Sequence, residues 1–286
     1  ASALQGELAL KVYPQLGLGN KNNNLAQFMS VGQIAYWLSE DIPKPQIRDY
    51  LFNKAAHPAS LPVTIEDLAI EQAIARQTIR ASVQQTTANL PYETTSAGPD
   101  MLPWLEMVVA SGGVLNHAPS PGQSLLMLLD GLQPTGITTF MLDHNEIISS
   151  LGVAAEINPL LAVQVLESQA LLNLGTVIAP VGITRPGAPI LRIRSTLNDG
   201  SQNNVDIKFG SIETIPVPSG QTAELHLQPL HRFDIGMGGP GKGGRVRVIG
   251  GELGIVIDAR GRPLHLNPDP AQRQTTIKRW ISVLEQ

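Results

Sequence analysis

Residues 104–134 have the sequence WLEMVVASGGVLNHAPSPGQSLLMLLDGLQP, and this stretch decides the predicted fold. Residues 106–110 form a short apolar run with two adjacent valines, which is typical of a buried strand. A Gly-Gly turn follows, and then Ser120 and Pro121 mark the start of a helix that is apolar nearly all round. Gly131 ends that helix. The order of strand, turn, loop and buried helix indicates an α/β fold.

The turn after this strand is a candidate binding site, made of Ser111, Gly112 and Gly113. Two adjacent glycines remove two side chains, so a ligand or another backbone segment can approach closely. In open α/β sheets, ligands bind just beyond the carboxyl ends of the strands. The turn is therefore either the edge of a nucleotide site or only a tight turn.

The composition narrows the class of protein. The chain has 286 residues, of which 42% are hydrophobic and 15% charged, so it folds as one large or two ordinary domains. A net charge of −4 gives no electrostatic case for nucleic-acid binding, and no apolar run approaches the ~18 residues of a membrane span. The absence of cysteine excludes disulfides, Cys-ligated zinc and thiol catalysis, and it fits a cytoplasmic protein.

The pattern of the chain changes near residue 183. Before that point helical periodicity alternates with apolar strand-like runs, and after it short alternating runs follow one another. Asp269 and Pro270 then start a final helix. We therefore predict an α/β lobe over residues 1–182. Over residues 183–286 we predict a β-rich sandwich or barrel domain closed by a C-terminal helix.

Several blocks of the first domain carry a family resemblance. They are, in chain order, ASGGVLNHAP, LLMLLDGLQP, TFMLD, INPLLAVQVLE and LGTVIAPVG. With them, residues 16–182 resemble the C-terminal half of the glutamate mutase accessory proteins, called GlmL or MutL. These proteins belong to the superfamily of actin, sugar kinases and heat-shock-protein-70. The resemblance implies that the α/β lobe is an incomplete second lobe of an actin-like ATPase, a ribonuclease-H-like domain.

The resemblance also implies which residues bind the cofactor. In that superfamily a Gly-Gly turn lies against the adenosine of ATP, which here corresponds to residues 111–113. The long helix before the Gly-Gly strand sends charged side chains to the adenosine, and Glu71, Arg76 and Arg80 occupy a comparable region, predicted as a helix from Thr64 to about residue 86. The alternative is that these three side chains form a solvated face of the helix.

Asp143 is a further candidate, because it stands at the end of a predicted strand over residues 136–142. A carboxylate there either contacts a ligand or caps the turn that follows, through residues 145–148. No catalytic residue and no metal ligand is assigned, since no Asp-x-Gly-Ser/Thr or Asp-Gly-Gly-x-Thr/Ser phosphate loop occurs in the chain. The chain opens with ASALQGEL, so we expect a fragment that lacks the lobe with those loops.

One glycine-rich segment, residues 236–243, matches G-x-x-x-x-G-K. A phosphate loop needs a hydroxyl residue next and a helix after it. Here Gly243 and the strand-like sequence RVRVI follow, so we reject the ATP-loop interpretation.

Two functions remain open. The resemblance implies an ATP-dependent reactivating chaperone for an adenosylcobalamin-dependent mutase, with ATP or ADP and Mg²⁺ bound by the whole protein and mutase subunits as partners. This chain alone would not hydrolyse ATP. The alternative is a non-catalytic binding or assembly module derived from an ATPase fold. A small-molecule kinase is disfavoured because no residue is placed as a substrate base. Self-association into a homo-oligomer is left open.

Overall fold

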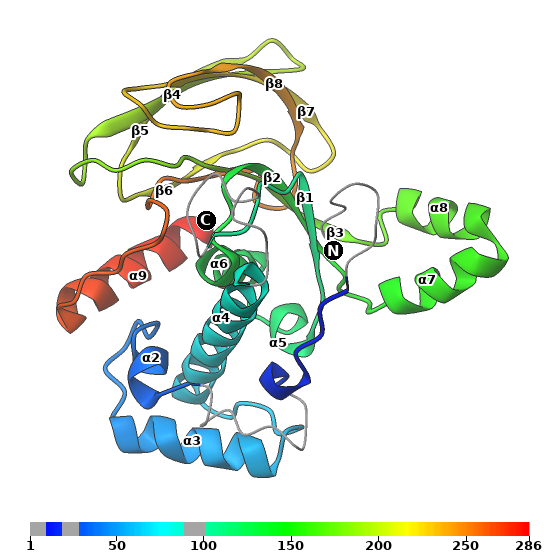
Figure 1. The fold of residues 1–286 in the computed structure, drawn as a ribbon. Helices are drawn as coiled ribbons and strands as arrows, with labels where there is room; N and C mark the ends of the chain where they lie inside the picture. The colour runs from blue at the N-terminus through cyan, green and yellow to red at the C-terminus, as the bar shows by residue number, and fades with distance from the viewer. Residues whose placement is uncertain (1–9, 19–28, 89–100, 286) are drawn as a thin grey trace. The chain divides into compact units, whose positions relative to one another are not determined.

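The computed structural model describes residues 10–18, 29–88 and 101–285, and the chain forms two compact units (Figure 1). Unit 1 consists of Ala1–Pro103, Leu126–Gln133 and Pro263–Ser282. Unit 2 consists of Trp104–Leu125, Pro134–Arg262 and Val283–Gln286. The predicted boundary between residues 182 and 183 falls inside unit 2, because strands from both sides of it pair in one sheet.

Unit 1 is helical. Its elements are the 3₁₀ helix η1 (Pro14–Leu16), α2 (Val31–Ala35), α3 (Lys44–Ala56), α4 (Ile65–Thr87), the second half of α6 (Pro121–Leu132) and most of α9 (Pro270–Leu284). Thr64 followed three residues later by Asp67 indicates a capping box at the start of α4, and the structure confirms it. The Asp67 backbone N–H donates to Thr64 Oγ1, and the Asp67 carboxylate accepts from the Thr64 backbone N–H.

The sequence was less informative near the N-terminus. The alternating apolar residues Leu8, Leu10 and Val12 predict a strand over residues 7–13. Residues 7–9 lie outside the described residues, and residues 10–13 are not in a strand. The apolar spacing of residues 25–38 predicts one helix, but the structure has only the short α2 there, and residues 25–28 lie outside the described part of the chain. Ser30 starts α2 because its side chain accepts from the Gln33 backbone N–H, and the Gln33 side chain accepts from the Ser30 backbone N–H.

Unit 2 contains a five-stranded mixed sheet with the order β1-β2-β3-β9-β6. The strands are β1 (Met107–Ala110), β2 (Gly136–Leu142), β3 (Leu172–Ala179), β9 (Ile255–Asp258) and β6 (Ile212–Ile215). β1 runs parallel to β2 and β3 parallel to β9, while β2 with β3 and β6 with β9 are antiparallel. The predicted strands around residues 106–110 and 136–142 are therefore confirmed. The predicted burial of the first is wrong, because β1 lies at the edge of the sheet and leaves Met107 58% and Val109 42% exposed.

A second sheet of unit 2 has four antiparallel strands in the order β5-β4-β7-β8. They are β4 (Pro189–Leu197), β5 (Gln202–Lys208), β7 (Thr222–Pro229) and β8 (Gly244–Ile249). Ile193 and Leu225 of this sheet share one hydrophobic core with Ile178 and Ile257 of the first sheet, which agrees with the sandwich alternative. β8 directly follows the glycine-rich segment, so the absence of a phosphate-loop helix there is confirmed.

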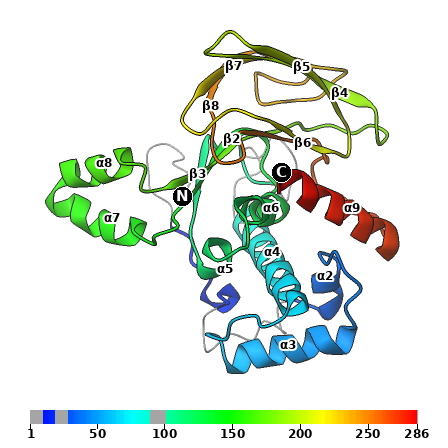
Figure 2. The same ribbon diagram turned by 180° about the vertical axis from the view of Figure 1, so that it is seen from behind.

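The helices of unit 2 are α5 (Gly113–Asn116), the first half of α6, α7 (Ile148–Ile157) and α8 (Pro159–Glu167), seen from behind in Figure 2. The pair Asn158–Pro159 predicts the start of a helix that ends at Gly175. The start is confirmed, because Asn158 Oδ1 accepts from the Leu161 backbone N–H. The predicted end is wrong, because α8 ends at Glu167 and residues 172–175 pair with β2. Among the described residues, no helix is both long and apolar enough to cross a membrane.

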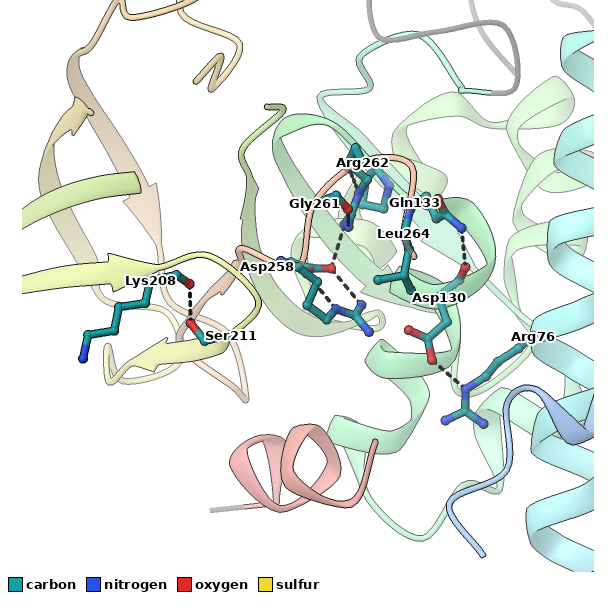
Figure 3. A network of polar contacts seen from close by, with 11 residues as sticks. Arg76, Asp130, Gln133, Lys208, Ser211, Asp258, Gly261, Arg262 and Leu264 are labelled. Carbon is teal, nitrogen blue, oxygen red and sulfur yellow. Dashed lines mark hydrogen bonds and ion pairs between the residues drawn. The ribbon is translucent and has the colours of Figure 1, made fainter. Parts of the chain in front are cut away.

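A buried cluster of ion pairs lies at the end of β9 (Figure 3). Asp258 is completely buried, and its carboxylate accepts from Arg260 Nε at 2.8 Å and from Arg262 Nη2 at 2.6 Å. Arg262 Nε also donates to the Pro134 carbonyl at 2.8 Å, just before β2. Burial alone would raise the pKa of Asp258, but the charges and hydrogen bonds of the two arginines hold it well below its usual range.

Removing this carboxylate should destabilise unit 2. Asp258→Asn is expected to lower the free energy of unfolding by about 3–5 kcal/mol, because two buried guanidinium groups would lose the carboxylate that both of them contact. Urea denaturation at neutral pH measures the loss. The matched control is Asp206→Asn, which breaks the exposed ion pair with Arg192 and should cost less than about 1 kcal/mol. Equal losses in both variants would contradict a special role for the buried cluster.

The same carboxylate should make stability depend on pH. Because the folded-state pKa lies below the unfolded value of about 3.9, the contribution is fully present above that value and is lost as the pH falls through the folded-state pKa. The wild type should therefore lose stability more steeply than Asp258→Asn as the pH is lowered from about 5 to about 2. Parallel curves for the two proteins would show that Asp258 does not carry this dependence.

Candidate functional site

The Gly-Gly turn lies at the carboxyl end of β1, as the sequence predicted. Gly112 has φ +137°, a backbone conformation that side-chain-bearing residues rarely adopt. Gly113 has no such constraint and is exposed. A Cβ atom added at either glycine would have no heavy atom within 4 Å. Packing within the chain therefore does not require Gly113, and the turn presents a bare surface beside the exposed Ser111.

The turn continues directly into α5. The Gly112 carbonyl accepts from the backbone N–H groups of Leu115 and Asn116, at 3.0 and 2.9 Å. His117 Nδ1 lies 2.8 Å from the Gly113 carbonyl oxygen, so the ring hydrogen-bonds within the turn. We assign His117 no catalytic role. The backbone of the turn is thus held by α5, while its outer surface stays open.

Asn116 is a candidate residue that the sequence reasoning missed. Its side chain is buried, and Nδ2 donates to the Asp143 carbonyl at 3.2 Å and to Glu146 Oε1 at 3.4 Å. Within the part of the chain that the structure describes, Oδ1 of Asn116 is buried without a hydrogen-bond partner. Buried acceptors are normally paired, so this oxygen is an exception that the described residues do not satisfy. No sequence motif distinguishes this asparagine from an ordinary loop residue.

Asp143 caps a helix. Its side chain is buried, with Oδ1 accepting from the Ile147 backbone N–H at 2.9 Å and Oδ2 from the Ile148 N–H at 3.0 Å. Its own backbone N–H donates to the Ala110 carbonyl at 2.8 Å, which joins the ends of β1 and β2. The capping interpretation of Asp143 is therefore confirmed, and contact with a ligand stays a prediction.

Glu71 and Arg76 lie on α4 in unit 1, and both side chains are buried, at 5% and 4% exposure. The alternative of a solvated charged face is therefore wrong for these two residues. Glu71 Oε1 pairs with Lys54 Nζ at 2.8 Å, and the Tyr50 hydroxyl donates to Glu71 Oε2. Burial raises the pKa of Tyr50, and the hydrogen bond to Glu71 and its charge raise it further.

Arg76 forms the second buried pair of α4, shown in Figure 3. Its Nε donates to Asp130 Oδ2 of α6 at 2.8 Å. Arg80, one turn further on, is half-buried. A charge that is paired with a residue far along the chain can be buried, and no local pattern on α4 reveals such a partner. Contacts of Glu71 and Arg76 with adenosine stay a prediction.

The predicted site residues are divided between the two units. Ser111, Gly112, Gly113 and Asp143 belong to unit 2, where hydrogen bonds link the turn, Asn116 and Asp143. Glu71 and Arg76 belong to unit 1, as do the residues they pair with. The structure thus brings together the unit 2 residues as one local site.

The unit 2 site has one open surface. The bare glycine turn leaves room for a flat ligand, whereas Asn116 Oδ1 is enclosed and is not exposed on that surface. Asp143 is not free to hold Mg²⁺, because both of its carboxylate oxygens serve as helix caps. Nowhere in residues 10–18, 29–88 and 101–285 do three His, Asp or Glu side chains gather to hold a metal ion.

The buried pair of Glu71 should be important for stability. Glu71→Gln is expected to lower the free energy of unfolding by about 3–5 kcal/mol, because Lys54 would stay buried without its counter-charge. Thermal and urea denaturation measure the loss. Glu66→Gln, an exposed change in the first turn of the same helix, should cost less than about 1 kcal/mol. A Glu71→Gln protein as stable as the control would contradict the structural role of the pair.

Comparison with known proteins gives one family match. The family described as MutL protein matches residues 3–170, which include α4, the Gly-Gly turn, Asn116 and Asp143. No curated protein and no solved structure matches the chain. Since the family match covers more than half of the 286 residues, this chain belongs to the MutL family, the family of glutamate mutase accessory proteins.

Proposed function

We propose that this chain is part of an ATP-dependent accessory factor. That factor reactivates an adenosylcobalamin-dependent mutase of the glutamate mutase type. In this proposal its α/β part derives from the second lobe of an actin-like, ribonuclease-H-like ATPase. The chain contributes the surface that contacts adenosine and surfaces that contact the mutase subunits. Membership of the family supports the accessory role, and the Gly-Gly turn supports the nucleotide.

The observation that carries the proposal is the bare turn at Gly112 and Gly113. It stands at the carboxyl end of a parallel strand, where α/β sheets bind ligands. Glycine at position 112 is explained by its positive φ, but none of the residues that the structure describes crowds position 113. A ligand that packs flat against the turn gives a reason for the second glycine.

Asn116 joins this surface to the end of β2. Its Nδ2 donates to the Asp143 carbonyl and to Glu146 Oε1, whereas its Oδ1 is buried and is not exposed on the turn. The contact with the base is therefore assigned to the bare glycine surface alone. When ATP is bound, the chemistry of phosphoryl transfer belongs to its metal-bound phosphates, and this chain's own residues would only position the adenosine.

The alternative function is a non-catalytic binding or assembly module. It is favoured by the charged candidate side chains, since Glu71, Arg76 and Asp143 are already engaged in buried pairs or a helix cap. In this alternative the chain contacts the mutase without any need for nucleotide.

Calorimetric titration of ATP and ADP with Mg²⁺ tests the adenosine surface. We expect micromolar to millimolar binding by the wild type and at least a tenfold weaker affinity for Gly113→Val. The valine covers the turn without straining the backbone, because Gly113 has an ordinary φ and open space around it. Gly32→Val is the matched control, since Gly32 is also exposed, lies in the first turn of a helix and has only one ordinary contact at 3.8 Å.

Absence of binding by the wild type, or equal binding by Gly113→Val, would contradict the adenosine surface and favour the module. Binding of the chain to purified mutase subunits, measured with and without ATP, then separates the two functions. An affinity that changes with ATP supports the accessory ATPase, whereas an affinity independent of nucleotide supports the module.

A further inference from the structure

The α7–α8 hairpin is larger than the fold of unit 2 requires. β2 and β3 are adjacent and antiparallel, so a turn of roughly two to five residues would join them. Instead residues 143–171 lie between the two strands and form two helices joined by the single residue Asn158. Figures 1 and 2 show α7 and α8 side by side, extending away from β2 and β3. The sheet does not need this insertion, so a separate role is expected for it.

The hairpin exposes most of its apolar side chains. None of the ten residues of α7 is buried, and Ala162 is the one buried residue of α8, all of them described by the structure. Six large apolar side chains of the hairpin are at least 44% exposed: Val153, Ile157, Leu160, Leu161, Val163 and Leu166. Helices of this length are marginal unless an apolar face is packed against something. A partner that covers this surface would stabilise the two helices by burying their exposed apolar side chains.

Gly152 leaves room for another backbone to approach α7 closely. It lies within the helix, has an ordinary φ and is exposed, and an added Cβ would meet no atom of the described residues within 4 Å. Glycine within a helix costs about 1 kcal/mol relative to alanine, and neither the backbone nor the packing of the chain requires it here. Close approach of a second backbone requires a residue without a side chain.

The charges of the hairpin restrict the kind of partner. Residues 148–167 contain Glu156 and Glu167 but no lysine or arginine. Interfacial membrane helices carry basic residues on their polar face, and nucleic-acid surfaces need cations. A nearly uncharged apolar surface is instead complementary to a copy of itself.

The area of the surface matches what a dimer needs. At roughly 100 Å² for each exposed side chain, the six apolar residues offer about 600 Å². A standard interface buries about 800 Å² on each partner, and the polar atoms around the apolar residues supply the rest. We propose that the α7–α8 hairpin is a dimerisation surface on which a second copy of this chain packs its own hairpin, forming a four-helix bundle.

The mass of the chain in solution tests this proposal. Light scattering behind size exclusion, over a series of micromolar concentrations, should give twice the chain mass of 30.6 kDa for the wild type. Ile157→Lys should raise the dimer dissociation constant about a hundredfold or more, because each dimer loses two apolar contacts and gains two charges. The matched control is Ile183→Lys, since Ile183 is 88% and Ile157 86% exposed. The control should remain a dimer.

Because the chain has no cysteine, single-cysteine variants give a second measurement that does not depend on a destabilising change. Ile157→Cys should cross-link two copies with a short bismaleimide, and Ile183→Cys should not. A monomeric wild type, or a dimer that survives Ile157→Lys, would overturn the proposal. A monomeric chain that binds phosphatidylcholine vesicles through Ile157 would also overturn it and assign the hairpin to a lipid surface.

Discussion

The buried charge of Asp258 is the constraint on which the arrangement of unit 2 depends. A carboxylate with no exposed surface is tolerated only where counter-charges and hydrogen bonds replace water, and Arg260 and Arg262 supply both. Arg262 also binds the carbonyl of Pro134, so the end of β9 and the start of β2 are fixed by one group of side chains. With β9 in place, β3 gains a parallel neighbour and β6 an antiparallel one.

The long helix of unit 1 also buries charged side chains that are paired with opposite charges. α4 buries Glu71 and Arg76 in a chain that has few charges, and each is paired within 2.8 Å. Such pairs contribute little net stability compared with apolar residues, but breaking one is costly because its partner stays buried. They therefore define which neighbour α4 packs against: Lys54 of α3 on one side and Asp130 of α6 on the other.

The two proposals for unit 2 meet at Asp143. Its carbonyl accepts from Asn116 beside the Gly-Gly turn, and its carboxylate caps α7, the first helix of the hairpin. The proposed adenosine surface and the proposed dimer surface are thus joined through one buried residue at the end of β2. A structural role for this carboxylate explains its place at a strand end as fully as a contact with a ligand would.

The sequence by itself determined the elements whose signals are local. The apolar run of β1, the Ser120–Pro121 start of α6, the capping box at Thr64 and the cap at Asn158 each depend on residues a few positions apart. Asn158 also lies in one of the blocks that carry the resemblance to the family that the chain belongs to. The tertiary structure alone decided the partners of Glu71 and Arg76, the unpaired acceptor of Asn116 and the pairing of β9 with β3. Those features join residues separated by up to about eighty positions, and such distant pairing leaves no periodic trace in the sequence because it forms only when the chain folds.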